Sequence, residues 1–540
     1  MRIAKALPTL LFALLIGSCD NRSSVEQANE EGIFVVGNSN EPKGLDPHLV
    51  SGVLESNIIG ALFEGLAVQD PIKDGDALPG AATSWSANED FTVWTFKLQP
   101  EGKWSDGVPV TAHDFVFSYQ RLLHPELPAK YSEMLYFIKG AEDYNKGKNP
   151  DPNSIGARAI DDHTLEITLR GPIPFLPEIT KHYTWYPVPR HKVLEFGEIA
   201  TPFTDWTDPG NMVSNGPFQL KSWRLTHHIE VERNPYYWDA KTVSLNGIRF
   251  LPIGNPYTES RMFLDGQLHM TYTLPPEMIP YAQEHIPNML RQEAYVGVRF
   301  IRCNTLRKPL DSPLVRRALA IAIDQASLID NVLQGGQLPA TGITPPFGDY
   351  KPPAVVTYNP EEARQLLAKA GFPDGKGFPE LKLLTNDKDS ARRNAEAFQA
   401  MWKDNLNINV RIEQREWTTY LELQYTSDYD LADNGWIGDY LDPTTFLEMW
   451  SEGNGNNNTN WSSKEYEAKL HLAENTADPA ERLRILAEGE SILLKDIPVI
   501  PIFWYTTNYL LRPEVKGWSP LLLNNHPLKF VRLEATAEQP

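Results

Sequence analysis

The chain has 540 residues, 41% of them hydrophobic and 22% charged, which is ordinary usage for soluble globular proteins and excludes wholesale disorder. Its 50 Lys and Arg against 70 Asp and Glu give a net charge of −20, which argues against a general nucleic-acid binder because phosphate recognition needs a basic surface. Two cysteines exclude a disulfide scaffold and a cysteine-ligated structural zinc, and the length predicts about two or three domains.

The first residues have the form of an export signal. An apolar run over residues 6–16 is too short to span a bilayer, because a spanning helix needs about 20 residues, so residues 1–18 predict a signal peptide. Residues 16–19 resemble a bacterial lipobox, in which Cys19 would be lipidated; the alternative is an ordinary signal peptide with a chance cysteine. In lipoproteins of hosts with two membranes, an Asp at the position of Asp20 resembles a signal for retention at the inner membrane.

The mature chain would begin with a polar stretch, and residues 19–32 are predicted to form a flexible tether. Cys303 would then be the only free cysteine, and a small buried apolar residue is a better interpretation of it than a nucleophile. No other apolar run in the sequence is long enough to span a membrane.

Strand-like segments are spread along the mature chain. Residues 92–98, 165–169 and 229–233 alternate apolar and polar side chains and predict strands. Residues 453–460, rich in Asn and Gly, predict a loop. Because helix patterns lie between these segments, the chain is predicted to be an α/β protein.

Three helix starts carry capping signals. Thr111 followed by Asp114 has the capping-box pattern. Residues 313–333 predict one apolar helix that opens on Ser-Pro and stops at a Gly pair. Asn359 before a proline predicts the cap of a further helix that ends near residue 371.

No recognisable catalytic or metal-binding motif is present in the sequence. The chain lacks G-x-S-x-G, the P-loop motif G-x-x-x-x-G-K-[ST] and H-E-x-x-H. His227 and His228 are adjacent in a predicted strand, so their side chains are expected to point to opposite faces rather than share a metal. We therefore expect no metal, no cofactor and no enzymatic activity, and favour a binding protein; the rival interpretation is an extracytoplasmic peptidase.

Several motifs, in order along nearly all of the mature chain, resemble those of one family, the oligopeptide-binding proteins of ABC importers (extracellular solute-binding protein family 5, peptide/nickel type). The motifs are LDPH at 45–48, WTFKL at 94–98, WSDG at 104–107, NGPF at 215–218, NPYYW at 234–238, GWIGDY at 435–440 and IPIFWY at 500–505.

The resemblance implies an α/β fold of the type II periplasmic-binding-protein kind, with two lobes, an inserted third domain and a hinged cleft. The expected boundaries are 33–67, 190–296 and 507–540 for lobe I, 68–189 for inserted domain II, and 297–506 for lobe III.

The resemblance also implies which residues bind the ligand. Asp439 matches the family Asp that pairs with a peptide α-amino group; from residue type alone it would be a loop Asp, because residues 439–443 are turn-like. Gly435 and Ile437 are expected to pair through their backbone with an extended peptide. Trp436 is expected to form the wall of a side-chain pocket, with a core Trp as the alternative.

Three tyrosines, Tyr131, Tyr272 and Tyr505, match positions of the family that line the ligand chamber, and ordinary packing is the alternative for each. One residue departs from the family pattern. Asp433 stands where some oligopeptide binders carry an Arg that holds the peptide carboxylate, and an acid there is expected to repel that carboxylate. The carboxylate would then be held elsewhere, or the preferred peptide length would differ.

The function implied is capture of oligopeptides in an enclosed cleft between the lobes and delivery to the permease of an ABC importer. The protein would be a monomer without nucleic-acid contacts. Its lipid anchor would be its one link to the membrane, in the periplasm or, in a host with a single membrane, at the cell surface. Two alternatives stay open: the same fold with another solute (murein peptide, haem, nickel or sugar), and a peptide sensor without a dedicated permease.

Overall fold

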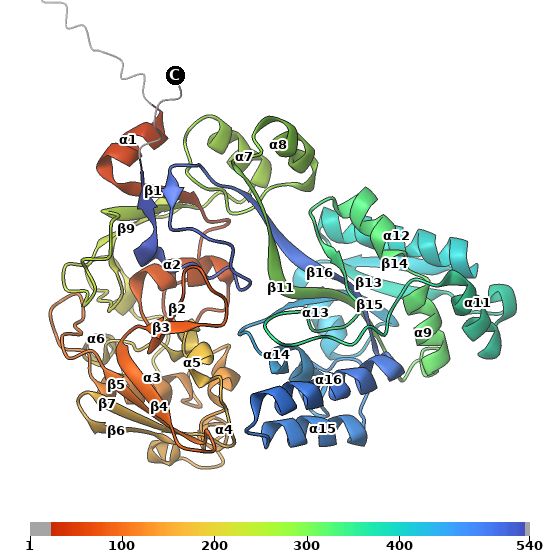
Figure 1. The fold of residues 1–540 in the computed structure, drawn as a ribbon, viewed down its shortest axis with the longest axis horizontal. Helices are drawn as coiled ribbons and strands as arrows, with labels where there is room; N and C mark the ends of the chain where they lie inside the picture. Colours follow the sequence, from red (N-terminus) through yellow and green to blue (C-terminus); the bar gives the residue numbers. More distant parts are fainter. Residues whose placement is uncertain (1–22, 535–540) are drawn as a thin grey trace, which may run out of the picture.

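A computed structural model of the chain describes residues 23–534. The predicted signal peptide, residues 1–18, and the predicted lipidation site Cys19 lie outside this range. Within it the chain forms three larger sheets, each with its own helices, and these occupy the upper left, lower left and right of Figure 1. We call each sheet with its helices a body, and number the three bodies in the order in which their sheets are described below. The protein is therefore a mixed α/β structure, as predicted.

The first sheet brings together residues far apart in sequence. Its strand order is β1-β10-β9-β8; β1 runs parallel to β10, and the other neighbours are antiparallel. Its strands are β1 (Ile33–Gly37), β8 (Phe218–Arg224), β9 (His228–Arg233) and β10 (Gly247–Leu251). The N-terminal strand is thus held in place by strands from the segment predicted to return to lobe I.

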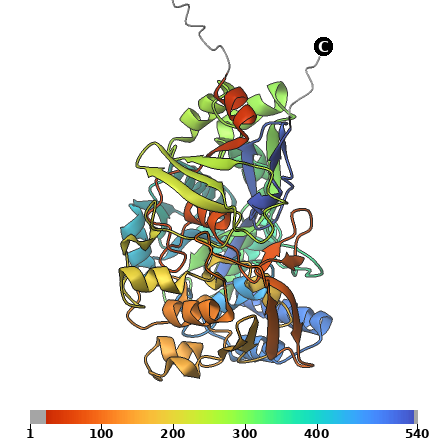
Figure 2. The same cartoon turned by 90° about the vertical axis from the view of Figure 1, so that its left-hand side faces the viewer.

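The second sheet is antiparallel in the order β4-β5-β7-β6 and lies below the first in Figure 2. Its strands are β4 (Ala82–Ala87), β5 (Val93–Leu98), β6 (Ala157–Asp161) and β7 (Thr164–Thr168). All four strands fall within residues 68–189, the predicted inserted domain. One continuous hydrophobic core, which includes Phe34, Trp94 and Ile248, joins this sheet to the first.

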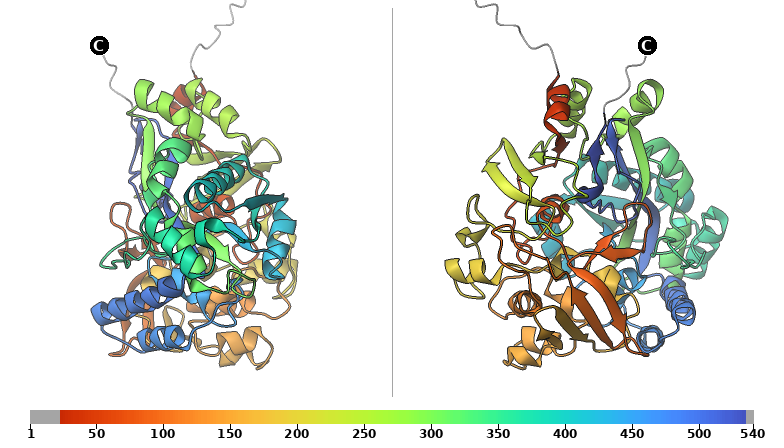
Figure 3. Two further views of the ribbon diagram at one scale, coloured as in Figure 1. Left: turned by 90° about the vertical axis from the view of Figure 1, so that its right-hand side faces the viewer. Right: turned by 60° about the vertical axis from the view of Figure 1, so that its left-hand side comes forward.

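The third sheet has six strands in the order β12-β16-β11-β15-β13-β14 and a second hydrophobic core of its own. Its strands are β11 (Leu290–Cys303), β12 (Leu338–Pro339), β13 (Leu381–Asn386), β14 (Val410–Arg415), β15 (Leu431–Ile437) and β16 (Val499–Leu510). Strands β11 and β16 are long, lie side by side, and run from the first body into the third (Figures 1 and 3).

The remaining elements cover these sheets or connect them. The helices are α1 (Ser24–Glu31), α2 (Val53–Leu62), α3 (Ala112–Leu122), α4 (Ala141–Asn145), α5 (Leu176–Ile179), α6 (Arg190–Phe196), α7 (Pro256–Leu264), α8 (Ile279–His285), α9 (Pro313–Ile321), α10 (Gln325–Leu328), α11 (Pro360–Lys369), α12 (Asp389–Leu406), α13 (Trp417–Tyr425), α14 (Thr444–Leu447), α15 (Lys464–Glu474) and α16 (Pro479–Asp496); the short strands are β2 (Ala67–Gln69), β3 (Ala77–Pro79), β17 (Val515–Lys516) and β18 (Arg532–Leu533).

Several local predictions are confirmed. Strands β5, β7 and β9 lie within one residue of the predicted segments 92–98, 165–169 and 229–233. Helix α3 begins after Thr111, whose backbone N–H donates to the Asp114 carboxylate at 2.8 Å. Cys303 is fully buried in the core of the third body, and burial raises the pKa of its thiol to about 12.

The predicted tether is wrong over residues 24–31. These residues form helix α1, which begins at a capping box between Ser23 and Glu26. Val25 and Ala28 are buried, and Ala28 packs in a hydrophobic cluster with residues of the first body. The segment is mainly polar, but its two apolar residues, Val25 and Ala28, are three positions apart and therefore share one face of a helix.

The predicted helix over residues 313–333 is also wrong in its middle. Helix α9 ends at Ile321, and Asp324 then caps a new helix by accepting a hydrogen bond from the Ser327 N–H at 3.0 Å. A π-helical turn, Ile329–Leu333, completes the segment. A side chain that can cap interrupts the helix even though the apolar pattern continues.

None of the helices within residues 23–534 is both long enough and apolar enough to cross a membrane.

Candidate functional site

Strand β15 has one edge without a strand partner over most of its length. It pairs with β11 from Leu431 to Ile437, but on its other side it pairs with β13 only at Leu431 and Ala432. The backbone of residues 433–437 therefore has an edge on which, among the described residues, no strand lies. Such an edge can accept an extended chain as an added strand.

The hydrogen-bond pattern shows which residues face the open edge. The Gly438 N–H donates to the Val296 carbonyl of β11 at 2.8 Å. Because successive backbone groups of a strand alternate between its two edges, Gly435 and Ile437 face the open side. The Tyr420 hydroxyl donates to the Asp433 carbonyl at 2.7 Å from α13, outside the pairing with β11, which agrees with this alternation.

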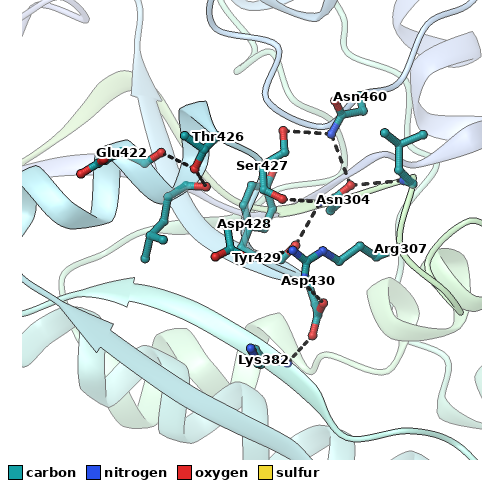
Figure 4. Close-up of polar contacts among 12 residues, drawn as sticks. Asn304, Arg307, Lys382, Glu422, Thr426, Ser427, Asp428, Tyr429, Asp430 and Asn460 are labelled. Carbon is teal, nitrogen blue, oxygen red and sulfur yellow. Dashed lines mark hydrogen bonds and ion pairs between the residues drawn. The ribbon is translucent and has the colours of Figure 1, made fainter.

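A network of polar contacts holds the turn that precedes β15 (Figure 4). The side-chain amide of Asn304, just after β11, donates to the carbonyls of Ser427 and Tyr429 at 2.9 and 3.1 Å. The Asp430 carboxylate accepts a hydrogen bond from the backbone N–H of Lys382 on β13 at 2.9 Å. Both neighbouring strands are thus tied to the start of β15, and this fixes where its open edge lies.

Asp439 follows β15 by two residues and has no cationic partner. Its carboxylate accepts one long hydrogen bond, from the Thr445 hydroxyl at 3.5 Å, and no Lys, Arg or His nitrogen of residues 23–534 lies within 4 Å of it. Burial and the nearby charge of Glu133 raise the pKa of Asp439 to about 7, while Thr445 lowers it. A cation beside this carboxylate would restore its ionised form.

Asp439 lies in the wall of a cavity of about 840 Å³. The wall combines residues of the second body, including Tyr131, Phe137 and Phe175, with residues of the third body, including Trp436. Tyr440 closes the wall at one point by stacking on Phe175, with ring centres 5.9 Å apart.

The cations in this wall already have carboxylate partners. Arg170 lies 3.2 Å from Glu474, and Lys146 lies 2.5 Å from Glu142. Arg482 forms a two-nitrogen pair with buried Asp442, at 2.6 and 2.9 Å. None of these cations pairs with Asp439, and Glu133 and Glu448 of the same wall likewise have no ion-pair partner among the described residues.

The structure separates the three predicted tyrosines. Tyr131 lines the large cavity, and burial together with the Asp439 charge raises the pKa of its hydroxyl. Tyr272 lines a separate cavity of about 60 Å³ in the first body. Tyr505 lies over Gly435, and its hydroxyl would be 2.4 Å from a Cβ placed on that glycine.

Asp433 does not offer a free negative charge. It is fully buried and forms a two-nitrogen ion pair with Arg299 of β11, at 2.7 and 2.5 Å. The pair has no net charge, so the predicted repulsion of a ligand carboxylate by Asp433 is wrong. The reason is a partner that lies 134 residues away in sequence. Arg299 and Asp433 are diagonal neighbours across the two strands, because Arg299 lies opposite Gly435 and Ile301 lies opposite Asp433.

Tyr295 is a residue near the candidate site that the sequence did not reveal. It lies in β11 where the register against β16 shifts, between Ala294 and Val298. After burial, the nearby groups that raise the pKa of its hydroxyl are Tyr272, Asp439 and Tyr505, so it lies among three predicted site residues. No motif marks Tyr295; its one signal was its position next to the predicted lobe boundary at residues 296 and 297.

Comparisons with known proteins match this chain to one family over most of its length. The family described as bacterial extracellular solute-binding proteins, family 5 (middle), matches residues 76–458. The chain is 36% identical over 527 residues to the periplasmic oligopeptide-binding protein OppA of Salmonella typhimurium, which covers 96% of this chain and 95% of that protein. It is 32% identical over 529 residues to the oligopeptide-binding protein OppA of Bacillus subtilis, with 94% and 95% covered.

A solved structure shares the fold. The crystal structure of Haemophilus influenzae OppA in complex with RPPGFSPFR superposes on this chain with a TM-score of 0.79 at 33% identity. The match covers 93% of this chain and 99% of that one.

We expect Gly435→Ala to destabilise the protein by about 1–2 kcal/mol in urea unfolding, because overpacking a filled site forces neighbours to move. The added Cβ would lie 2.4 Å from the Tyr505 hydroxyl and 3.2 Å from the Val298 carbonyl. The double variant with Tyr505→Phe should recover part of the loss. Gly44→Ala, where a Cβ meets nothing within 4 Å, is the control; equal losses for the two alanines would contradict the close approach.

Proposed function

This chain belongs to the bacterial extracellular solute-binding proteins of family 5, and on that premise we propose that it captures oligopeptides beside Asp439 and delivers them to the permease of an ABC importer. One observation carries the proposal: a half-buried carboxylate without a cation stands at the end of an open strand edge, in a large cavity between two bodies. A free α-amino group is the cation that every unmodified peptide presents, whatever its sequence.

The open edge supplies the other interaction that does not depend on peptide sequence. The backbone groups of Gly435 and Ile437 face away from β11, and an extended peptide can pair with them as an added strand once the Gly435 N–H leaves the Asn434 side-chain oxygen, to which it donates at 2.7 Å. Side chains of the peptide would alternate on the two sides of this strand, one of them against Trp436. The site would hold the common groups tightly and the side chains loosely.

Binding would be coupled to movement of the lobes about the crossing strands. We keep the predicted boundaries as part of this proposal: lobe I at 33–67, 190–296 and 507–540, domain II at 68–189, and lobe III at 297–506. Strands β11 and β16 pass from lobe I to lobe III with a shift of register between Ala294 and Val298. Hinge closure at such crossing points encloses the ligand, and the closed form would dock on the permease.

No chemical step is part of the proposed function. The relatives are named as binding proteins, and the cavity groups described above are explained by recognition of an ammonium and a peptide backbone. We also propose that the protein acts as a monomer without a cofactor. Recovery of intact peptide after prolonged incubation is expected, and cleavage products would contradict this part.

We expect Asp439→Asn to weaken the binding of a free tetrapeptide by about 100-fold in calorimetry, because the charge-assisted contact with the ammonium is lost. An N-acetylated copy of the same peptide should bind the wild type about as weakly as the free peptide binds the variant. Glu452→Gln removes an exposed acid from the same cavity wall and should leave the affinity unchanged. Unchanged affinity in Asp439→Asn would remove the assigned role.

Peptide affinity should rise with pH between 6 and 7.5. The pKa of Asp439 is raised to about 7, so at pH 6 most of the protein carries a proton that an arriving ammonium must displace. With an α-amino pKa near 7.7–8.0, the net gain from pH 6 to 7.5 is about five-fold. Titration calorimetry across this range tests it, and Asp439→Asn should show a flat profile; the same slope in both proteins would assign the proton to another group.

We propose that the protein is exported and held at the membrane by a lipid on Cys19, in the periplasm at the inner membrane because Asp20 follows, or at the cell surface of a host with one membrane. The relative from Salmonella typhimurium is named as periplasmic, which supports export. Cys19→Ala should move the protein from the membrane fraction to the soluble extracytoplasmic fraction. A variant that still sediments with membranes would rule out Cys19 as the anchor.

A further inference from the structure

Arg302 is a buried cation near the proposed peptide site that has no acidic partner. It lies on β11 and is 4% exposed. Its guanidinium donates to two neutral oxygens, the side-chain oxygen of Gln424 at 2.6 Å and the carbonyl of Asn456 at 3.1 Å, and its Nε has no hydrogen-bond partner. Within residues 23–534, no Asp or Glu oxygen lies within 4 Å of its nitrogens, and burial lowers its pKa.

The other buried arginines of the described chain have their charge compensated. Arg121 and Arg482 each form a two-nitrogen pair with a buried aspartate. Arg316 donates to the last carbonyls of α16, at the negative end of that helix. Arginine does not lose its proton in proteins, so Arg302 keeps its charge in a buried position, where the guanidinium lies 5.4 and 5.8 Å from the ring centres of Phe300 and Trp450 but faces no anion.

Arg302 lines a cavity of about 210 Å³ beside the open edge of β15. The described wall of this cavity contains no Asp or Glu; it combines aromatic rings such as Trp417 with neutral amides such as Gln424 and Asn434. A wall of this kind can enclose a ligand group and leave Arg302 as its only charged contact.

This smaller cavity adjoins the cavity of Asp439. Trp436 and Asn456 line both of them, and the indole N–H of Trp436 is buried without a partner. A ligand group in the smaller cavity would face the Arg302 guanidinium and the Trp436 indole, and both are donors. An acceptor with a negative charge satisfies both.

We propose that Arg302 binds a carboxylate of the ligand, either the C-terminal carboxylate of a short peptide or the side chain of an acidic residue. The inference rests on the proposed function and adds a second charged contact to it. Asp439 would hold the positive group of the peptide and Arg302 a negative one, at two ends of the same open edge.

The separation of the two groups suits a short peptide. Gly435, which lines the Arg302 cavity, comes four residues before Asp439, and four residues of chain span at most about 14 Å. An extended peptide anchored by its ammonium at Asp439 would bring a carboxylate of its first few residues to this cavity. Both sources of carboxylate fit this span, so the experiment must distinguish them.

The test is titration calorimetry with a matched peptide set at pH 7.5. Tetra-alanine is compared as free acid and as C-terminal amide, which isolates the terminal carboxylate. Amidated tetrapeptides with Glu at the second or third position are compared with their Gln counterparts, which isolates the side chain. We expect at least one carboxylate peptide to bind the wild type about 10- to 100-fold more tightly than its neutral partner.

Arg302→Met should reduce that difference to within about two-fold while neutral peptides bind with little change. Gln424→Glu is a second variant that keeps the arginine and places a carboxylate beside its guanidinium. Gln424→Glu should also remove the preference for carboxylate peptides. It serves as the test variant if Arg302→Met does not fold. A carboxylate preference that survives in a folded variant would overturn the proposal.

The outcomes separate this inference from the proposed function. If neutral peptides bind the wild type and depend on Asp439, but no carboxylate raises the affinity, the assignment of Arg302 is overturned and the proposed function stands. If no peptide of the set binds the wild type, both are overturned.

Discussion

The pairing of β11 with β16 is the constraint on which the rest of the structure depends. These two strands run antiparallel from Leu290 opposite Leu510 to Arg302 opposite Val499, so they join the first body to the third. The other edge of β11 positions β15, and with it the open backbone edge and Asp439. Strand β11 therefore takes part both in the connection between the first and third bodies and in placing the candidate site.

Two charged groups of the candidate site have no partner of opposite charge among the described residues, and the proposed zwitterionic ligand would supply both partners. Asp439 is a half-buried carboxylate without a cation, and Arg302 is a buried guanidinium without an acid. Asp433, by contrast, is compensated by Arg299. The net charge of −20 says nothing about this arrangement, because the proposed recognition depends on two particular groups and not on the bulk surface.

Local signals in the sequence predicted local structure, and they failed where contacts between distant residues determine the structure. The capping pattern of Thr111 with Asp114 marked the start of α3 because both partners lie within one turn. The helix break at Asp324 arises because a capping side chain competes with continuation of the helix, and the apolar pattern does not show this. The buried face of α1 depends on packing against the first body, which a mainly polar composition does not show. The family motif drew attention to the segment that contains Asp439, but the partner of Asp433 lies on a strand 134 residues earlier and could not be found from spacing.

The central claim is that the ammonium of a peptide replaces a proton on Asp439. Calorimetry at pH 6 in two buffers with different ionisation enthalpies counts the protons released when a peptide binds. With the pKa of Asp439 raised to about 7, the wild type should release close to one proton per peptide and Asp439→Asn should release none. Peptide binding without proton release in the wild type would contradict the account.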